Sequence, residues 1–96
     1  MYLLNVSYSK TPAAVEPHIA AHGAWVKQYF EAGPILFAGP KKSGLGGVIL
    51  VKAIDKAELR RILAEDSYVQ ADVADYEIVE FDCKLAQAEI KALTGV

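Results

Sequence analysis

A histidine and a carboxylate, far apart in the sequence, are the side chains whose chemistry stands out first. His22 can take up or release a proton near neutral pH, and it interrupts an apolar helical stretch over residues 15–33. Asp66 ends a second helical stretch, where the helix dipole disfavours a carboxylate by about 0.3–1 kcal/mol and Glu65 adds a like charge. A carboxylate that orients an imidazole is the arrangement of a general acid or base.

The helical pattern around His22 predicts that its ring points into the protein. At about 100° per residue from Val15, Val26 and Phe30 fall within about 60° of the start, and His22 at about 340° lies in the same apolar arc. A buried imidazole needs a partner, because an unpaired buried polar group costs about 1–3 kcal/mol. Asp66 is the predicted partner, since both helices should lie on one face of the sheet. A second interpretation stays open, in which His22 is a core histidine bonded to a carbonyl and Asp66 begins a turn.

Further side chains are predicted to lie around this pair and to contact a substrate: Tyr8, His18, Trp25, Ser67 and Tyr68. Packing in the core remains the alternative for the aromatic members. His18 and His22 also have the spacing of a zinc pair, but no third ligand stands at a supporting spacing, and we predict neither a metal nor a cofactor. The glycine-rich stretch 43–47 is not followed by a helix with a lysine and serine, so it predicts a hairpin turn rather than a phosphate loop.

Composition narrows the class of protein. The 96 residues, 53% of them hydrophobic, predict one domain over residues 1–96. A net charge of -2 without a basic stripe argues against nucleic acid as a partner. No apolar run approaches the ~20 residues that span a bilayer, so we expect no membrane association. The single cysteine, Cys83, fits a reducing compartment, which predicts a cytoplasmic protein and gives no sign of a catalytic thiol.

The order of predicted elements indicates the fold. Alternating and continuous apolar patterns, helix caps and glycine or proline stops predict strands over 2–8, 35–40, 47–53 and 76–82, helices through about residue 32 and over 55–66, and a terminal helix over about 84–94. This order, β-α-β-β-α-β, is the ferredoxin-like α+β arrangement, an antiparallel sheet with both helices on one face. The terminal helix should place Ala86, Ile90 and Leu93 on one side.

The second face of such a sheet is predicted to be apolar. In the first strand Tyr2, Leu4, Val6 and Tyr8 alternate with Leu3, Asn5 and Ser7, so the two sets lie on opposite faces. Leu3 is expected on the second face, together with Ile49 and Val51 from the third strand. The chain has no further element to cover them. We therefore predict a homodimer in which two copies pack sheet against sheet, with higher assemblies left open.

Three segments together resemble the YCII-related family. They are AHGAWVKQYFEAGPILFAGP at 21–40, GGVILVKA at 46–53 and LAEDSYVQADVADYEIVEF at 63–81. The resemblance implies a dimeric α+β barrel built from ferredoxin-like halves. It also implies an enzyme without a cofactor that uses His22 and Asp66 as an acid and base pair. The implied reactions are isomerisation or elimination, as by a dehydrochlorinase, on a small organic molecule such as a lactone or hydroxyquinone.

Three positions differ from the family pattern. Gly23 and Gly44 stand where many relatives have arginine, and Ser67 stands where proline is usual. If those arginines hold a substrate carboxylate, this chain is expected to take a less anionic molecule, with Lys41 and Lys42 as the cations of the same loop. Two other functions stay open: a domain that binds a small molecule or assists another protein without chemistry, and a cofactor-free monooxygenase on the same barrel.

Overall fold

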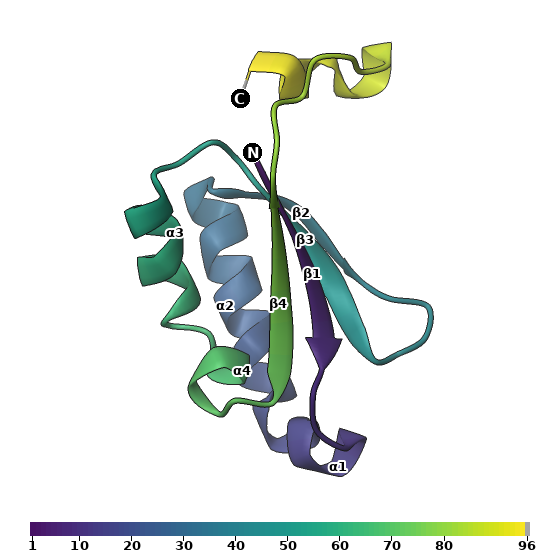
Figure 1. Cartoon of the computed structure of the whole chain (residues 1–96), viewed down its shortest axis with the longest axis vertical. Coiled ribbons are helices and arrows are strands. Elements are labelled where there is room, and N and C mark those ends of the chain that lie inside the picture. Colours follow the sequence, from purple (N-terminus) through teal and green to yellow (C-terminus); the bar gives the residue numbers. More distant parts are fainter. Residues whose placement is uncertain (96) are drawn as a thin grey trace.

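Four antiparallel strands form a single sheet in the computed structural model, which describes residues 1–95 (Figure 1). The strands are β1 (Tyr2–Tyr8), β2 (Ile35–Pro40), β3 (Gly46–Val51) and β4 (Ala74–Glu80). They lie in the order β2-β3-β1-β4, so each helical connection crosses over one intervening strand. The longer helices, α2 (Ile19–Ala32) and α3 (Lys56–Leu63), lie on the same side of the sheet (Figure 1). The predicted α+β class and antiparallel sheet are confirmed.

The core lies between the sheet and these helices. On β1 the alternation is as predicted: Tyr2, Leu4 and Val6 are buried and face the helices. Opposite them in the register lie Val51, against Tyr2, and Ile49, against Leu4. Because directly paired residues share a face, Ile49 and Val51 belong to this core. Their predicted place on the second face is wrong.

The second face of the sheet is apolar through other residues of the same strands. Leu50 pairs with Leu3 and Val48 with Asn5, so Val48 and Leu50 take the place that was predicted for Ile49 and Val51. A shift of one residue moves every side chain to the other face, and β3 is apolar at both sets of positions. The sequence pattern therefore carries no information that distinguishes the two faces of β3.

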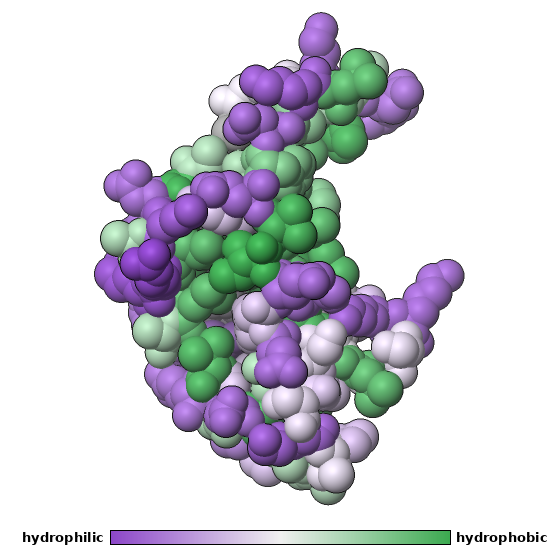
Figure 2. Space-filling view, viewed as in Figure 1, coloured by the Kyte–Doolittle hydropathy of each residue, from purple (hydrophilic) through white to green (hydrophobic). Residues whose placement is uncertain are grey.

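Apolar side chains are also exposed along the edge strand β4. Figure 2 shows them gathered midway along the viewed face, over β4 and α3. On β4 the exposed members are Ile78, which shares the helix side with Leu4, and Val79, which shares the second face with Leu3. The molecule thus leaves apolar surface uncovered on both sides of this edge.

The first helical stretch is broken instead of continuous. It consists of α1 (Pro12–Val15), a short 3-10 helix η1 (Glu16–His18) and α2. Pro17 has no backbone N–H and cannot continue an α-helical ladder, which explains the break. His18 is therefore the N-cap residue of α2 rather than a residue one turn before His22 in the same α-helix. At the other end Gly33, with φ of 113°, closes α2 in the left-handed conformation, as predicted.

A short helix that the sequence pattern did not predict follows α3. It is α4 (Ser67–Gln70), and Asp66 is its N-cap, with the side chain accepting a hydrogen bond from the Tyr68 amide. Asp66 thus lies at a favourable helix N-terminus, and the apparent cost of a carboxylate at a helix end is removed.

The terminal helix predicted over about 84–94 is present only in part, and as a 3-10 helix. The chain is irregular over residues 81–87 and then forms a 3-10 segment, η2 (Ala88–Gly95), which is kinked at Ile90. Leu85 is 94% exposed and Ile90 is 51% exposed. A helix of about ten residues is marginal without an apolar surface to pack on, and this segment extends away from the sheet (Figure 1).

Candidate active site

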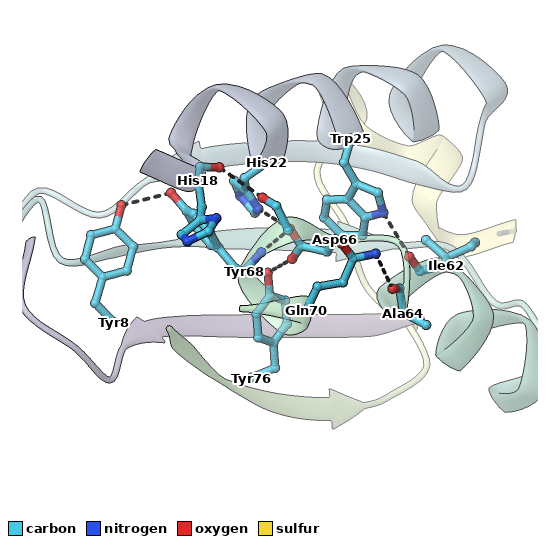
Figure 3. Close-up of polar contacts among 11 residues, drawn as sticks. Tyr8, His18, His22, Trp25, Ile62, Ala64, Asp66, Tyr68, Gln70 and Tyr76 are labelled. Carbon is cyan, nitrogen blue, oxygen red and sulfur yellow. Dashed lines mark hydrogen bonds and ion pairs between the residues drawn. The ribbon is translucent and has the colours of Figure 1, made fainter. Parts of the chain in front are cut away.

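The carboxylate of Asp66 is the most buried polar group among the described residues, with no exposed surface. One oxygen, Oδ1, accepts from His22 Nδ1 at 2.7 Å and from the Tyr68 backbone N–H at 3.1 Å. The other, Oδ2, accepts from the hydroxyl of Tyr76 (Figure 3). Three donors satisfy an acid that would be strongly unfavourable if buried alone. The carboxylate is fixed in one orientation by α2, α4 and β4 together.

The His22 ring lies between this carboxylate and open space. It stacks on the ring of Tyr68, with the two centroids 3.9 Å apart and the planes 3° from parallel. Among residues 1–95, the ring makes its one hydrogen bond through Nδ1, and no buried side-chain nitrogen or oxygen lacks a partner. Nε2 is therefore accessible on the side of the ring away from Asp66. With an ionised Asp66, Nδ1 must carry the proton, so Nε2 of a neutral ring has a free lone pair.

Two contacts hold the helices so that Asp66 meets His22. The indole nitrogen of Trp25 donates to the carbonyl of Ile62 at 2.9 Å, and the hydroxyl of Tyr29 donates to Glu65. Both contacts join α2 to α3 or to the residues just after it, one and two turns beyond His22. Trp25 is 5% exposed and belongs to the core, so this candidate substrate contact is a residue that positions the helices.

The hydroxyl groups of Tyr8 and Tyr68 form a second polar feature beside the histidine. They lie 3.3 Å apart, and either can donate to the other. Burial of Tyr68, followed by its contact with Tyr8, raises the pKa of the Tyr68 phenol. The phenol of Tyr68 therefore keeps its proton at neutral pH, and the pair retains an O–H that can donate to a bound molecule.

These residues open onto a cavity of about 340 Å³. It is lined by His22, Tyr8 and Tyr68 together with apolar or small residues of α2 and of the strands β1, β2 and β3: Val6, Ile19, Gly23, Val26, Ala38, Gly39, Pro40, Gly46, Gly47, Val48 and Ile49. Such a mostly apolar hollow with a few converging polar groups is the usual form of a small-molecule site. Its volume fits a molecule with one ring.

Two further predicted contacts lie next to the cavity without lining it. Ser67 uses its hydroxyl to donate to the carbonyl of His18 at 3.0 Å, a contact that ties α4 to the start of α2 (Figure 3). Of the seven side chains named from the sequence, the structure brings His22, Asp66, Tyr8 and Tyr68 together. Across residues 1–95, no three histidine, cysteine or acidic side chains come together as a metal site would need.

Tyr76 is the residue of this cluster that the sequence reasoning missed. It lies on β4 opposite Val6, on the helix side of the sheet. Burial, and then its hydrogen bond to Asp66, raises the pKa of the Tyr76 phenol, so the hydroxyl remains a donor. The sequence did hold one signal for this residue. Tyr76 and the apolar Ile78 are two positions apart on a predicted strand, so they share a face, and an apolar residue indicates the face toward the helices.

Comparison with known proteins adds a family and a fold. The sequence profile of the YCII-related domain matches residues 1–82. The structure is similar to that of 5-chloro-2-hydroxyhydroquinone dehydrochlorinase from Burkholderia phenoliruptrix AC1100, solved in complex with 2,5-dihydroxybenzoquinone. The TM-score is 0.63 and the identity is 18%, over 85% of this chain and 94% of that one. No functionally curated protein matches by sequence. Within residues 1–95, no helix is both long and apolar enough to cross a bilayer.

Proposed function

Since the chain belongs to the YCII-related domain family, we propose that it is a small enzyme that transfers protons on a compact organic molecule, with His22 as the general acid and base. Asp66 is proposed to orient the imidazole. The observation that carries this proposal is the 2.7 Å bond between His22 Nδ1 and Asp66 Oδ1 on a ring that lines an apolar cavity. A fixed Nδ1–H leaves Nε2 as the acceptor that faces a bound molecule.

The proposed reaction begins with removal of a proton by Nε2. The proton comes from a carbon next to a carbonyl, and the electron pair of the broken C–H bond moves into an enolate. The imidazolium that forms is stabilised by the Asp66 carboxylate. It can then return the proton to a different carbon, which is an isomerisation. Alternatively the enolate electrons expel a leaving group such as chloride with its bonding pair, which is an elimination.

The two tyrosine hydroxyls support this chemistry. Charge develops on the carbonyl oxygen as the proton leaves, and a donor that already points into the cavity stabilises it without reorganisation. The Tyr8 and Tyr68 pair has one O–H that is not needed for the contact between the two. We therefore assign these residues to the substrate oxygen.

The proposed substrate class is a hydroxyquinone or lactone that carries no carboxylate or phosphate group. The cavity residues are apolar or small apart from His22 and the two tyrosines, so a carboxylate or phosphate group finds no lysine or arginine there. The structurally similar dehydrochlorinase acts on a chlorinated hydroxyhydroquinone and was solved with a dihydroxyquinone, and we extend that substrate class to this chain as part of the proposal.

We propose that the enzyme works as a cytoplasmic homodimer without a cofactor. Phe37, 50% exposed, and Val79, 45% exposed, flank Leu3 and Leu50 on the second face of the sheet. An apolar surface of this kind is commonly covered by a second copy.

Hydrogen exchange tests proton transfer without requiring the physiological substrate. The ring hydrogens of 2,5-dihydroxybenzoquinone exchange when an acid adds a deuteron to the ring carbon and a base then removes the original proton, and in D2O this exchange is followed by loss of the proton NMR signal. The protein should accelerate this exchange, and His22→Gln should slow it by about 10²–10⁴-fold. Added imidazole should restore part of the rate to His22→Ala. Equal exchange rates in the wild type and in His22→Gln would remove the proposal.

A binding domain without chemistry is the second candidate, supported by the same cavity. It predicts that the quinone binds the wild type without faster exchange or product formation, and that His22→Ala keeps the affinity. Isothermal titration calorimetry alongside the exchange measurement separates the two functions. An oxygen electrode trace with a hydroquinone tests the monooxygenase alternative, which predicts oxygen consumption that depends on the protein.

A further inference from the structure

A second hollow lies directly beside the His22 cavity. It measures about 360 Å³ and is lined by Gly23, Val26, Lys27, Phe30, Ile35, Phe37 and Ala38. Gly23, Val26 and Ala38 line both hollows, so the two hollows lie next to each other between α2 and β2. We call the second hollow the side groove. A molecule held against His22 is therefore next to the side groove.

The side groove is lined mainly by apolar side chains, and the largest of them are well exposed to solvent. Phe30 on α2 is 57% exposed, and Phe37 on β2 is 50% exposed. Phe30 lies in the α2 wall beside Val26, and Phe37 lies at the outer edge of β2, where its pairing with Leu50 places it at the border of the groove and the second face. Adjacent exposed apolar side chains of this kind mark places where an apolar partner binds. Lys27 is the one charged side chain among these lining residues, and it lies at the rim, exposed and within 4.0 Å of Glu31.

Gly23 lies where the two hollows meet. A glycine in the middle of α2 weakens the helix, and its φ lies in the ordinary range, so the backbone does not require it. A Cβ built at this position meets nothing within 4 Å. The absence of a side chain therefore leaves open the passage between the His22 cavity and the side groove.

We propose that the side groove binds an uncharged apolar chain carried by the substrate, an alkyl or aryl substituent on the ring that sits against His22. The inference rests on the proposed function only for the identity of the ring. The groove, its apolar lining and the open position at Gly23 are independent of any chemistry at His22. The substrate class that follows is a ring of the hydroxyquinone type with an apolar tail.

The test closes the passage at Gly23 and compares ligands with and without a tail. Gly23→Leu places a branched side chain between the two hollows, and Ala24→Leu adds the same side chain one residue further along, on an exposed position of the same helix. Thermal unfolding should show both variants folded, with Gly23→Leu at least as stable as the wild type because leucine favours a helix more than glycine does. Three probes are titrated: 2,5-dihydroxybenzoquinone, its 3-hexyl derivative, and the uncharged fluorophore N-phenyl-1-naphthylamine.

The hexyl derivative should bind the wild type and Ala24→Leu at least about tenfold more tightly than the bare ring, because each methylene removed from water contributes about fourfold. Gly23→Leu should lose this gain. N-phenyl-1-naphthylamine should bind the wild type and lose at least about tenfold in affinity in Gly23→Leu. The inference is overturned if the tail gives no gain, or if both leucine variants affect the fluorophore equally.

The outcomes separate the inference from the proposed function. Binding of the bare ring without a gain from the tail overturns the side groove and leaves the proposed function standing. A second outcome is that neither quinone binds, while the fluorophore binds the wild type and loses affinity in Gly23→Leu. This result overturns the proposed ring class and supports the side groove. Sedimentation velocity adds one more contrary result: if Gly23→Leu changes the assembly state while ligand binding is unaffected, a second copy of the chain covers the groove instead of a substrate tail.

Discussion

The hydroxyl of Tyr76 should stabilise the fold through the buried carboxylate of Asp66. In Tyr76→Phe the ring stays, but Oδ2 of a carboxylate with no exposed surface loses its donor. Hydrogen bonds to charged groups contribute about 1.5–3 kcal/mol, so the free energy of unfolding should fall by about that amount. For a domain of this size the melting temperature should fall by roughly 6–24 °C.

Urea unfolding followed by circular dichroism measures this loss, with Tyr2→Phe as the matched control. The Tyr2 hydroxyl donates to a neutral carbonyl, that of Ile54 at 2.7 Å, so its removal should cost only about 0.5–1.5 kcal/mol. In an Asp66→Asn background the effect of Tyr76→Phe should shrink to about 1 kcal/mol or less, because the acceptor is then neutral. A loss in Tyr76→Phe no larger than in Tyr2→Phe would refute the description of Asp66 as an acid held by three donors.

Three other predictions test the phenols, the hairpin and the assembly. Burial, and then contacts with Asp66 for Tyr76 and with Tyr8 for Tyr68, raise the pKa of both phenols above the ordinary value of 10.0. The folded state therefore holds these protons more tightly than the unfolded state, so their contribution to stability is complete below about pH 10 and is lost as the pH rises further. Absorbance at 295 nm should show the last phenols ionising above pH 10, together with unfolding; ionisation of all five tyrosines near pH 10 in a folded protein would contradict this. Gly46→Ala should cost about 3 kcal/mol or more, because its Cβ would clash with the Val6 carbonyl oxygen at a φ of 147°, whereas Gly44→Ala, in open space at a φ of 74°, should cost about 1–2 kcal/mol in thermal denaturation; equal costs would argue against this close approach. Val79→Lys places a charge on the second face of the sheet and should convert a dimer to a monomer in sedimentation velocity, while an unchanged dimer would place the interface elsewhere.

The sequence predicted the parts of this structure that depend on strong local patterns. Alternation placed Tyr2, Leu4 and Val6 in the core, and glycine at position 33 marked the end of α2, because both signals come from the local geometry of the chain. The face of β3 was misassigned because both of its sides are apolar, and only the pairing with β1 decides between them.

The meeting of His22 with Asp66 followed from a polar residue in an apolar arc and an acid at the end of a helix. Tyr76 was missed because its partner lies ten residues away on another element, and a tyrosine in a strand pattern looks the same whether it packs or donates. The sequence also does not distinguish aromatic residues of the core from those of the site. Only the structure shows that Trp25 donates to the Ile62 carbonyl in the core, whereas Tyr68 lines the cavity.

The protonation of the two His22 nitrogens tests the proposed mechanism most directly. Nitrogen-15 NMR of the histidine side chains, at a pH where the ring is neutral, should show a proton on Nδ1 and none on Nε2. Asp66→Asn should weaken this preference, because a neutral amide selects Nδ1–H less strongly than a carboxylate does. A wild-type ring that carries its proton on Nε2, or one that is unchanged by Asp66→Asn, would contradict the assignment of His22 as a base oriented by Asp66.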